Sequence, residues 1–200
     1  SFQILECLVI WLAAAFVLLG TNEYYPGDTA DSRLATVYSL VKDGAWYLDR
    51  PLEGPPNPFE QRTIDKVVLD GHILSSKPPM LSLLMTAEYL ALNKTLGWDF
   101  EDEEGENIED INKIVRVMSM TLIGLAFVAA LVFFRKTLHL FVRDPLVRLL
   151  LLFSFAFCTQ LWGFSTGITN HVPAAAMIVI AVYYALGLGS GKLEPRAWRF

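Results

Sequence analysis

The sequence predicts an all-α, polytopic membrane protein. Of its 200 residues, 54% are hydrophobic and the mean hydropathy is +0.40, and the hydrophobic residues are clustered in long runs, unlike those of a soluble domain. Most of the 21 acidic residues fall between Glu23 and Asp110, whereas the segments after Phe134 are basic. Apolar runs that separate acidic from basic segments are typical of membrane-spanning helices joined by loops on opposite sides of a bilayer.

The first predicted span covers residues 4–20, which are almost continuously apolar and are interrupted only by Glu6. At about 1.5 Å per residue, this run is marginal for a hydrocarbon core of ~30 Å. A signal peptide would have a basic segment before the apolar run and small residues at a cleavage site, and neither is present. We therefore expect a transmembrane helix.

Residues 21–113 form a large predicted loop with two amphipathic helices at the membrane interface. The first helix covers about residues 29–43, with Asp28 as its N-cap and Gly44 at its end. Asp31 follows the three- and four-residue spacing of the apolar positions after it. The spacing therefore places a carboxylate on the apolar side of this helix.

The second helix of the loop covers about residues 79–96, an apolar run of the length expected for an interfacial helix rather than a span. Before it, residues 45–61 are rich in Pro and Gly and predict irregular structure, and a short strand is expected around residues 67–69. Ser76 is the expected N-cap. Pro78 or Pro79 suits the first turn, where a missing N–H costs nothing.

Lys77 stands just before this helix, where free backbone N–H groups and the positive end of the helix dipole favour an anion. A cation and free N–H groups at the mouth of an apolar helix predict a site for a phosphate attached to a lipid. The alternative interpretation is an ordinary capped helix beside a solvated lysine.

Three further spans are predicted over residues 114–134, 146–164 and 172–188. Short basic segments follow the first and the third of them, so the positive-inside rule places both segments and the N-terminus in the cytoplasm and the loop of residues 21–113 outside. Residues 99–110 are expected to be a solvated acidic loop, since Gly105 falls one place late for a calcium-binding EF-hand. We expect the chain to be the N-terminal part of a longer protein, a single transmembrane domain over residues 1–200.

The order of these features resembles the N-terminal half of GT-C glycosyltransferases that use polyprenyl-phosphate sugars, in particular the protein O-mannosyltransferases and the lipid A aminoarabinose transferases. The matching segments are Ala30-Asp31-Ser32-Arg33-Leu34-Ala35, Gly44-Ala45-Trp46, Lys77-Pro78-Pro79-Met80 and Arg116. The resemblance covers nearly the whole chain and rests on the order and spacing of these segments. The chain departs from the family at Ala30, where an acidic pair would begin, and at Asn170, where the second outer loop usually has an acid.

The resemblance implies a GT-C helical bundle that moves a sugar from a polyprenyl-phosphate donor to a lipid, protein or glycan acceptor outside the cytoplasm. The implied base for the acceptor hydroxyl is Asp31, with Asp28 nearby, and burial on an apolar face should raise the pKa of Asp31. The implied ligands of the donor phosphate are Lys77, Arg33 and Arg116. The implied residues of the second outer loop are Asn170 and His171.

Each of these residues also has a purely structural interpretation. Asp28 and Asp31 favour a helix N-terminus, the basic residues are expected near any membrane surface, and Asn170 suits a helix cap. No metal-ligand spacing stands out in the sequence. A divalent ion held by Asp28 and Asp31 is the one metal hypothesis that the sequence leaves open.

Two other functions compete with sugar transfer. One is a non-catalytic membrane transporter or assembly subunit. Transporters tend to have polar groups in the middle of the membrane, whereas here the ionisable residues avoid the centres of the three strong spans. The other is a degenerate family member that binds a lipid-linked sugar without transferring it. Nucleic-acid binding is not expected, because no basic patch is interleaved with aromatic residues. Cys7 and Cys158 lie in apolar runs, which argues against a disulfide or a metal site. The expected location is a bacterial plasma membrane, with the active site facing outward.

Overall fold

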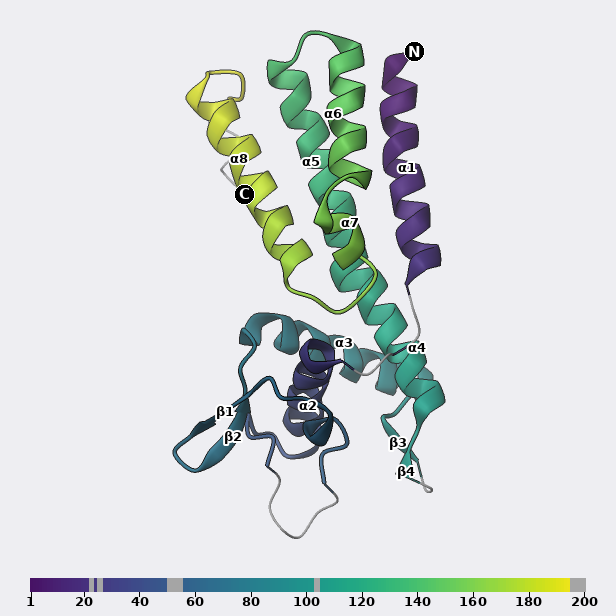
Figure 1. The fold of residues 1–200 in the computed structure, drawn as a ribbon, viewed down its shortest axis with the longest axis vertical. Helices are drawn as coiled ribbons and strands as arrows, with labels where there is room; N and C mark the ends of the chain where they lie inside the picture. Colours follow the sequence, from purple (N-terminus) through teal and green to yellow (C-terminus); the bar gives the residue numbers. More distant parts are fainter. Residues whose placement is uncertain (22–23, 25–26, 50–55, 103–104, 195–200) are drawn as a thin grey trace. The chain divides into compact units, whose positions relative to one another are not determined.

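The computed structural model describes residues 1–21, 24, 27–49, 56–102 and 105–194, which are mostly helical (Figure 1). The chain divides into two compact units. The membrane unit comprises Ser1–Thr21, Ile123–Thr166 and Asn170–Phe200, and the loop unit comprises Asn22–Leu122 and Gly167–Thr169.

Within the described residues, three helices are long and apolar enough to cross a membrane. They are Phe2–Gly20, which is α1, the continuous helix Ile108–Phe141, and His171–Gly189, which is α8. Their large apolar side chains remain exposed, as expected of surfaces that face lipid. The predicted spans over residues 4–20, 114–134 and 172–188 are thus confirmed as helices of spanning length.

The predicted span over residues 146–164 is wrong as a single helix. Helix α6 covers only Pro145–Phe157, 13 residues or about 20 Å, and a five-residue helix, α7, follows at Gln160–Phe164. The break lies at Thr159, which is extended with φ −113° and ψ 159°. Its hydroxyl donates to the Phe155 carbonyl at 3.0 Å, so the side chain satisfies an acceptor that the helix end leaves free.

The continuous helix Ile108–Phe141 is longer than predicted at both ends. It consists of α4 (Ile108–Met118), a π-helical segment η2 (Ser119–Gly124) and α5 (Leu125–Phe141). The side chain of Asn107 caps its start by accepting from the Asp110 N–H at 3.1 Å, and such a cap lets polar residues form the first turns before the apolar run begins. The boundary between the two units falls inside η2.

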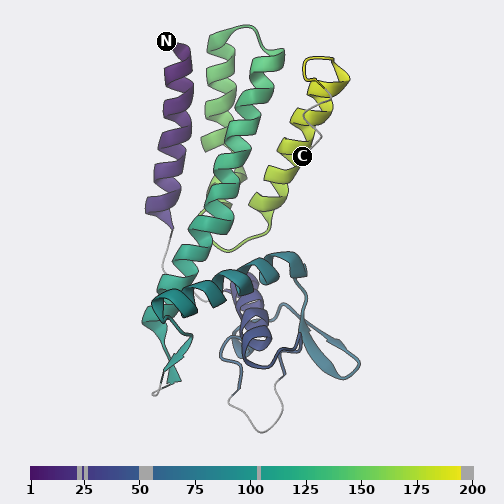
Figure 2. The same cartoon turned by 180° about the vertical axis from the view of Figure 1, so that it is seen from behind.

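In the membrane unit, α5 packs against α8, α1 and α6. Both views show α5 and α8 side by side (Figures 1 and 2). At one end of the unit, Glu6 of α1 is 1% exposed. Its Oε2 accepts from Nε of Arg135 at 2.8 Å and is 2.6 Å from Nε2 of His139, and its Oε1 accepts from Nε of Arg148 at 3.1 Å. One carboxylate therefore joins α1, α5 and α6.

The same end of the membrane unit holds the N-terminus, the α5–α6 connection and the end of α8 (Figure 1). Lys192, which follows α8, donates to the Leu140 carbonyl near the end of α5 at 2.5 Å. This arrangement is the one that the predicted topology requires, since that topology places the N-terminus and both basic segments on one side.

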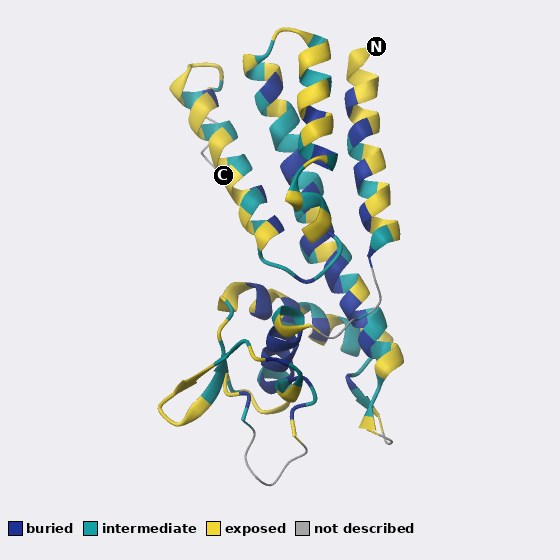
Figure 3. Cartoon of the chain, in the orientation of Figure 1, coloured by how far each residue is buried: buried dark blue, intermediate teal, exposed yellow. Residues whose placement is uncertain are grey.

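The loop unit is built around α2, Asp28–Lys42. Nine consecutive residues of α2, from Asp31 to Ser39, are buried (Figure 3). The prediction that this helix has one wet face is therefore wrong for its middle part. The side expected to face water has small hydroxyl residues that bond inside the protein: Ser32 donates to the Asp65 carbonyl at 2.7 Å, and Ser39 accepts from Asn57 at 3.0 Å.

The other elements of the loop unit are a 3-10 turn Glu60–Arg62, a hairpin of β1 (Lys66–Leu69) and β2 (His72–Ser75), α3 (Pro79–Leu96), a small hairpin of β3 (Glu101–Asp102) and β4 (Gly105–Glu106), and α4. The 3-10 turn, β2 and α3 pack against α2, and α4 packs against α3. Tyr38 of α2 lies against the rings of Phe59 and Phe100, and Tyr89 of α3 stacks on Phe100 at 4.3 Å. These aromatic rings form the core of the unit.

The first hairpin extends the predicted strand over residues 67–69. Strands β1 and β2 pair antiparallel from Lys66↔Ser75 to Leu69↔His72, around a two-residue turn in which Asp70 and Gly71 have φ of 52° and 85°. An Asp-Gly pair favours this kind of hairpin turn, so the second strand also has a local signal in the sequence.

The helix α3 has the bounds predicted for it, residues 79–96. It ends at Gly97, whose φ of 74° is the left-handed conformation that suits glycine after a helix. Its N-cap is Pro78, with φ −54° and ψ 133°, and not Ser76, whose N–H donates to the Asp65 carbonyl at 3.0 Å.

Candidate functional site

The Asp31 carboxylate is fully buried in the first turn of α2. Its Oδ1 accepts from the Tyr24 hydroxyl, and its Oδ2 accepts from the Gly27 N–H at 2.8 Å. Burial raises the pKa of Asp31 above its ordinary value, and the two hydrogen bonds oppose this only in part. The raised pKa of Asp31 agrees with the expectation, although residues on every side of the middle of α2, and not one side alone, are buried.

Behind Asp31 lies a chain of polar contacts that the sequence did not predict. Nη1 of Arg62 donates to the Tyr24 hydroxyl oxygen at 3.1 Å, and Nη2 of Arg62 pairs with Glu106. Burial, together with the bond to Asp31, raises the pKa of Tyr24, so its hydroxyl keeps its proton and acts as the donor to Asp31. The pairing with Glu106 raises the pKa of Arg62, so its charge is fixed.

Asp28 serves a different contact and does not cap α2. The N-cap of the helix is Gly27, whose backbone is extended. Oδ1 of Asp28 accepts from the Ile64 N–H at 2.9 Å, and its carbonyl accepts from the Thr63 hydroxyl at 2.7 Å. Asp28 thus fastens the start of α2 to the segment before β1.

The partners of Asp28 and Asp31 bear on the hypothesis of a divalent ion. The two carboxylates bind separate sets of donors, Ile64 for Asp28 and Tyr24 with Gly27 for Asp31. In the part of the chain that the structure describes, no group of three His, Cys, Asp or Glu side chains could hold a metal. The structure thus offers no described ligand set for the ion.

Lys77 forms an ion pair with Asp65, with Nζ 2.5 Å from Oδ2. The Thr29 hydroxyl donates to the same carboxylate oxygen at 3.2 Å. The hydrogen bond from Lys77 lowers the pKa of Asp65, and the nearby charge of Arg33 adds to this effect. The predicted cation is present, and its ammonium group is paired with a carboxylate of the protein itself, that of Asp65.

The turn before α3 offers fewer free N–H groups than predicted. The Ser76 N–H donates to Asp65, as described above, and the Lys77 N–H donates to Oγ of Ser75 at 3.1 Å. Pro78 and Pro79 have no N–H group. A phosphate at this turn would therefore depend on the lysine charge and on the N–H groups that follow Pro79, which have no side-chain cap.

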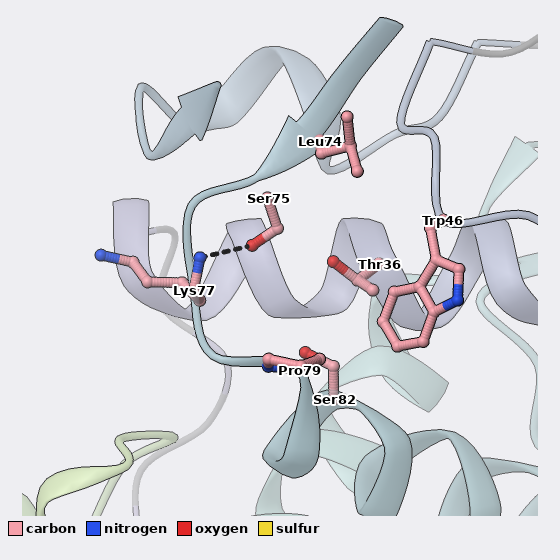
Figure 4. Close-up of a pocket in the computed structure, with 7 residues that line it drawn as sticks. All are labelled: Thr36, Trp46, Leu74, Ser75, Lys77, Pro79 and Ser82. Atoms are coloured by element: carbon pink, nitrogen blue, oxygen red, sulfur yellow. Dashed lines mark hydrogen bonds between the residues drawn. The ribbon is translucent and has the colours of Figure 1, made fainter. Parts of the chain in front are cut away.

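Next to Lys77, the loop unit contains a pocket of about 210 Å³. Its lining residues come from α2, the loop after it, β2 and the start of α3: Thr36, Trp46, Leu74, Ser75, Lys77, Pro79 and Ser82. Figure 4 shows the Trp46 ring on one side of the pocket and the ammonium end of Lys77 pointing away from that ring. The pocket thus combines one aromatic wall with serine and threonine hydroxyls, beside a cation that lies at its edge.

Arg33 and Arg116, the other predicted phosphate ligands, have different surroundings. Arg33 is fully buried, donates from Nη1 to the Thr29 carbonyl at 2.9 Å, and has a pKa lowered by its burial. Arg116 is exposed on α4, and its side chain has no hydrogen bond or ion pair among the described residues. Arg33 and Lys77 both lie near Asp65, whereas no contact among the described residues joins Arg116 to them.

Asn170 and His171 belong to the membrane unit, whereas the other predicted site residues belong to the loop unit. Asn170 is the N-cap of α8 by position, but its side chain makes no cap hydrogen bond. His171 opens α8, with its ring centroid 4.8 Å from that of Phe164. The structure thus brings Asp31, Asp28, Arg33 and Lys77 into one unit, and Asn170 and His171 belong to the other.

Comparison of the chain with protein-family models, with curated proteins and with solved structures finds no match in any of the three. The functional interpretation therefore depends on the residues of this chain and their geometry.

Proposed function

We propose that the chain belongs to a membrane glycosyltransferase that moves a sugar from a polyprenyl-phosphate donor to a lipid, protein or glycan acceptor on the outer side of the membrane. The observation that carries this proposal is the Asp31 carboxylate. It is buried, has a raised pKa, and lies in the same unit as the Lys77–Asp65 pair and the pocket beside it. Perturbed carboxyl groups near a pocket and a cation are typical of catalytic sites.

Asp31 is the general base in this proposal. Its Oδ1 already accepts a hydrogen bond from a hydroxyl, that of Tyr24. An acceptor hydroxyl in the place of the Tyr24 hydroxyl would give its proton to Asp31 as its oxygen bonds to the anomeric carbon of the sugar. The bond from that carbon to the phosphate oxygen breaks in the same step, and the polyprenyl phosphate leaves with the electron pair.

Lys77 stabilises the negative charge of the departing phosphate. A donor phosphate would take the place of Asp65 at the lysine, so one anion replaces another and no cation is left without a partner. The Asp65 side chain is 27% exposed, so water can solvate its carboxylate after the exchange. Arg33 contributes positive charge to the same place, as its effect on the pKa of Asp65 indicates.

The pocket beside Lys77 is the proposed place for the donor sugar. Its volume of about 210 Å³ is below the range typical of drug-sized ligands and suits a single sugar ring. The Trp46 ring offers an apolar wall, and the hydroxyl groups opposite it offer hydrogen-bond partners.

The full-length protein tests this proposal when it is purified and reconstituted with polyprenyl-phosphate-linked mannose, glucose or aminoarabinose. Membrane extracts supply the acceptors, and mass spectrometry follows the free polyprenyl phosphate. Turnover of at least one donor is the expected result. Binding of a donor without turnover would favour a protein that binds a lipid-linked sugar without transferring it, the alternative suggested by Asn170 in the place of an acid. Absence of binding to all three donors would overturn the proposal.

A further inference from the structure

The membrane unit has a groove of about 310 Å³ between α1 and α5. Its lining residues are apolar or weakly polar except for one arginine: Cys7, Ile10, Trp11, Ala14, Val128, Val132 and Arg135. The eight residues from Val128 to Arg135 span about 10 Å of helix. Glu6, the neighbour of Cys7, bonds to Arg135, so the charged end of the groove is the end where the ion cluster of α1, α5 and α6 lies.

The cluster at this end has more positive than negative charge. The single carboxylate of Glu6 faces the guanidinium groups of Arg135 and Arg148 and the ring of His139. Arg148 also donates from Nη1 to the carbonyls of Val142 and Arg143, which follow α5. Arg135 bonds to Glu6 through Nε, and its side chain lines the groove, so the charge next to the groove lacks a full counterion.

Nearby charges of the described residues do not supply that counterion. Asp144 uses its carboxylate to accept from the Leu146 and Val147 N–H groups at the start of α6. Lys136, the next residue after Arg135, lies over the Phe133 ring with Nζ 4.6 Å from its centroid. A monovalent anion beside Arg135 would therefore complete the charge balance.

We propose that this groove binds one chain of an anionic phospholipid and that Arg135 binds the phosphate of its headgroup. An apolar groove of about 10 Å suits part of an acyl chain, and a guanidinium group suits a phosphate through two parallel hydrogen bonds. The groove opens beside basic residues, which the positive-inside rule places at the leaflet that holds anionic lipids. A covering protein helix would have to bring its own acid to avoid enclosing the Arg135 charge, whereas a phospholipid brings one charge with an apolar chain.

Photo-crosslinking tests this assignment in the full-length protein reconstituted into nanodiscs. The probe is phosphatidylglycerol with a diazirine in one acyl chain, and the matched probe is phosphatidylcholine with the same chain. We expect phosphatidylglycerol to label the peptides around Ile10 and Val132 in clear preference to phosphatidylcholine. Arg135→Gln should lower this labelling roughly tenfold, the effect expected of one charge-assisted contact, whereas Lys136→Gln, the adjacent cation outside the groove, should change it less than about twofold.

A second variant keeps the test decisive in case Arg135→Gln does not fold. Ala14→Trp fills the groove and leaves every charge in place, so it should also abolish the preferential labelling. Equal labelling by the two lipids, equal losses at Arg135 and Lys136, or absence of label from the groove peptides would each overturn the proposal. Displacement of the probe by polyprenyl phosphate more readily than by unlabelled phosphatidylglycerol would also overturn it, because the groove would then be a site for the donor lipid.

Discussion

Replacing Glu6 with glutamine should destabilise the membrane unit by about 3 kcal/mol. The glutamine has the shape of glutamate but lacks its charge, so Arg135, His139 and Arg148 lose their common counterion and meet an amide N–H₂ group. Removing one partner of a buried ion pair costs about 3–5 kcal/mol. The side chains of Arg135 and Arg148 are 27% and 15% exposed, so water solvates them in part and the lower end of that range applies.

Thermal unfolding of the purified protein in detergent measures this change. For a chain of 150–250 residues, each kcal/mol lowers the Tm by about 2–4 °C, so Glu6→Gln should lower it by about 6–12 °C. Glu194→Gln is the matched control, since it makes the same change of charge at an exposed residue. A Tm for Glu6→Gln no lower than that of the control would refute the reasoning that the cluster holds α1 to α5 and α6.

Three further predictions concern the loop unit and the topology. Lys77→Ala should weaken the binding of a labelled polyprenyl phosphate by about tenfold to a hundredfold, since a charge-assisted contact contributes ~1.5–3 kcal/mol, and Asp65→Asn should strengthen it by removing the competing carboxylate. Equal losses in Lys77→Ala and in the control Lys94→Ala would refute the phosphate site. With Cys7 and Cys158 replaced by alanine, a cysteine at Gly105 should react with an impermeant reagent from outside and one at Asp144 should not; the reverse pattern would refute the topology. Burial raises the pKa of Asp31, and a general base must be ionised to act. As the pH is lowered, turnover should therefore begin to fall at a higher pH than it would if the base were an exposed aspartate. A fall only near pH 4, the ordinary pKa of aspartate, would contradict this.

Elements whose signals are local could be predicted from the sequence. The bounds of α3 agree with the prediction because Pro79 and Gly97 mark its two ends. The end of α2 agrees because Gly44, with φ of 65°, follows its C-cap. The apolar runs of α1 and α8 are long enough for their hydropathy alone to identify them.

The break between α6 and α7 could not be predicted from hydropathy, because an average over many residues hides the effect of one polar residue. Thr159 stands within an apolar stretch, and a hydropathy window that covers residues 146–164 remains apolar despite it. In the structure α6 ends at Phe157, and Thr159 is extended with its hydroxyl bonded to the Phe155 carbonyl. An average over a hydropathy window does not detect such a local change of backbone conformation.

The surroundings of Asp31 could not be predicted because they depend on distant contacts. Arg62 is 38 residues from Tyr24 and 44 from Glu106 along the chain, and no local pattern joins them. The same holds for Glu6, which lies 129 residues from Arg135. The sequence also suggested a wet face for α2, since hydroxyl residues such as Ser32 and Ser39 are polar in any scale, although in the structure they bond inside the core.

The most direct test of the account compares Asp31→Asn with Asp28→Asn in the full-length enzyme. Both substitutions are nearly isosteric and remove one acid from the same turn of α2, and turnover and donor affinity are measured separately for each. We expect Asp31→Asn to abolish turnover while donor binding stays within about threefold, because a base acts in the chemical step. Asp28→Asn should keep most of its turnover, because the asparagine can still accept from the Ile64 N–H. Undiminished turnover in Asp31→Asn, or its loss in Asp28→Asn alone, would contradict the assignment of Asp31 as the base.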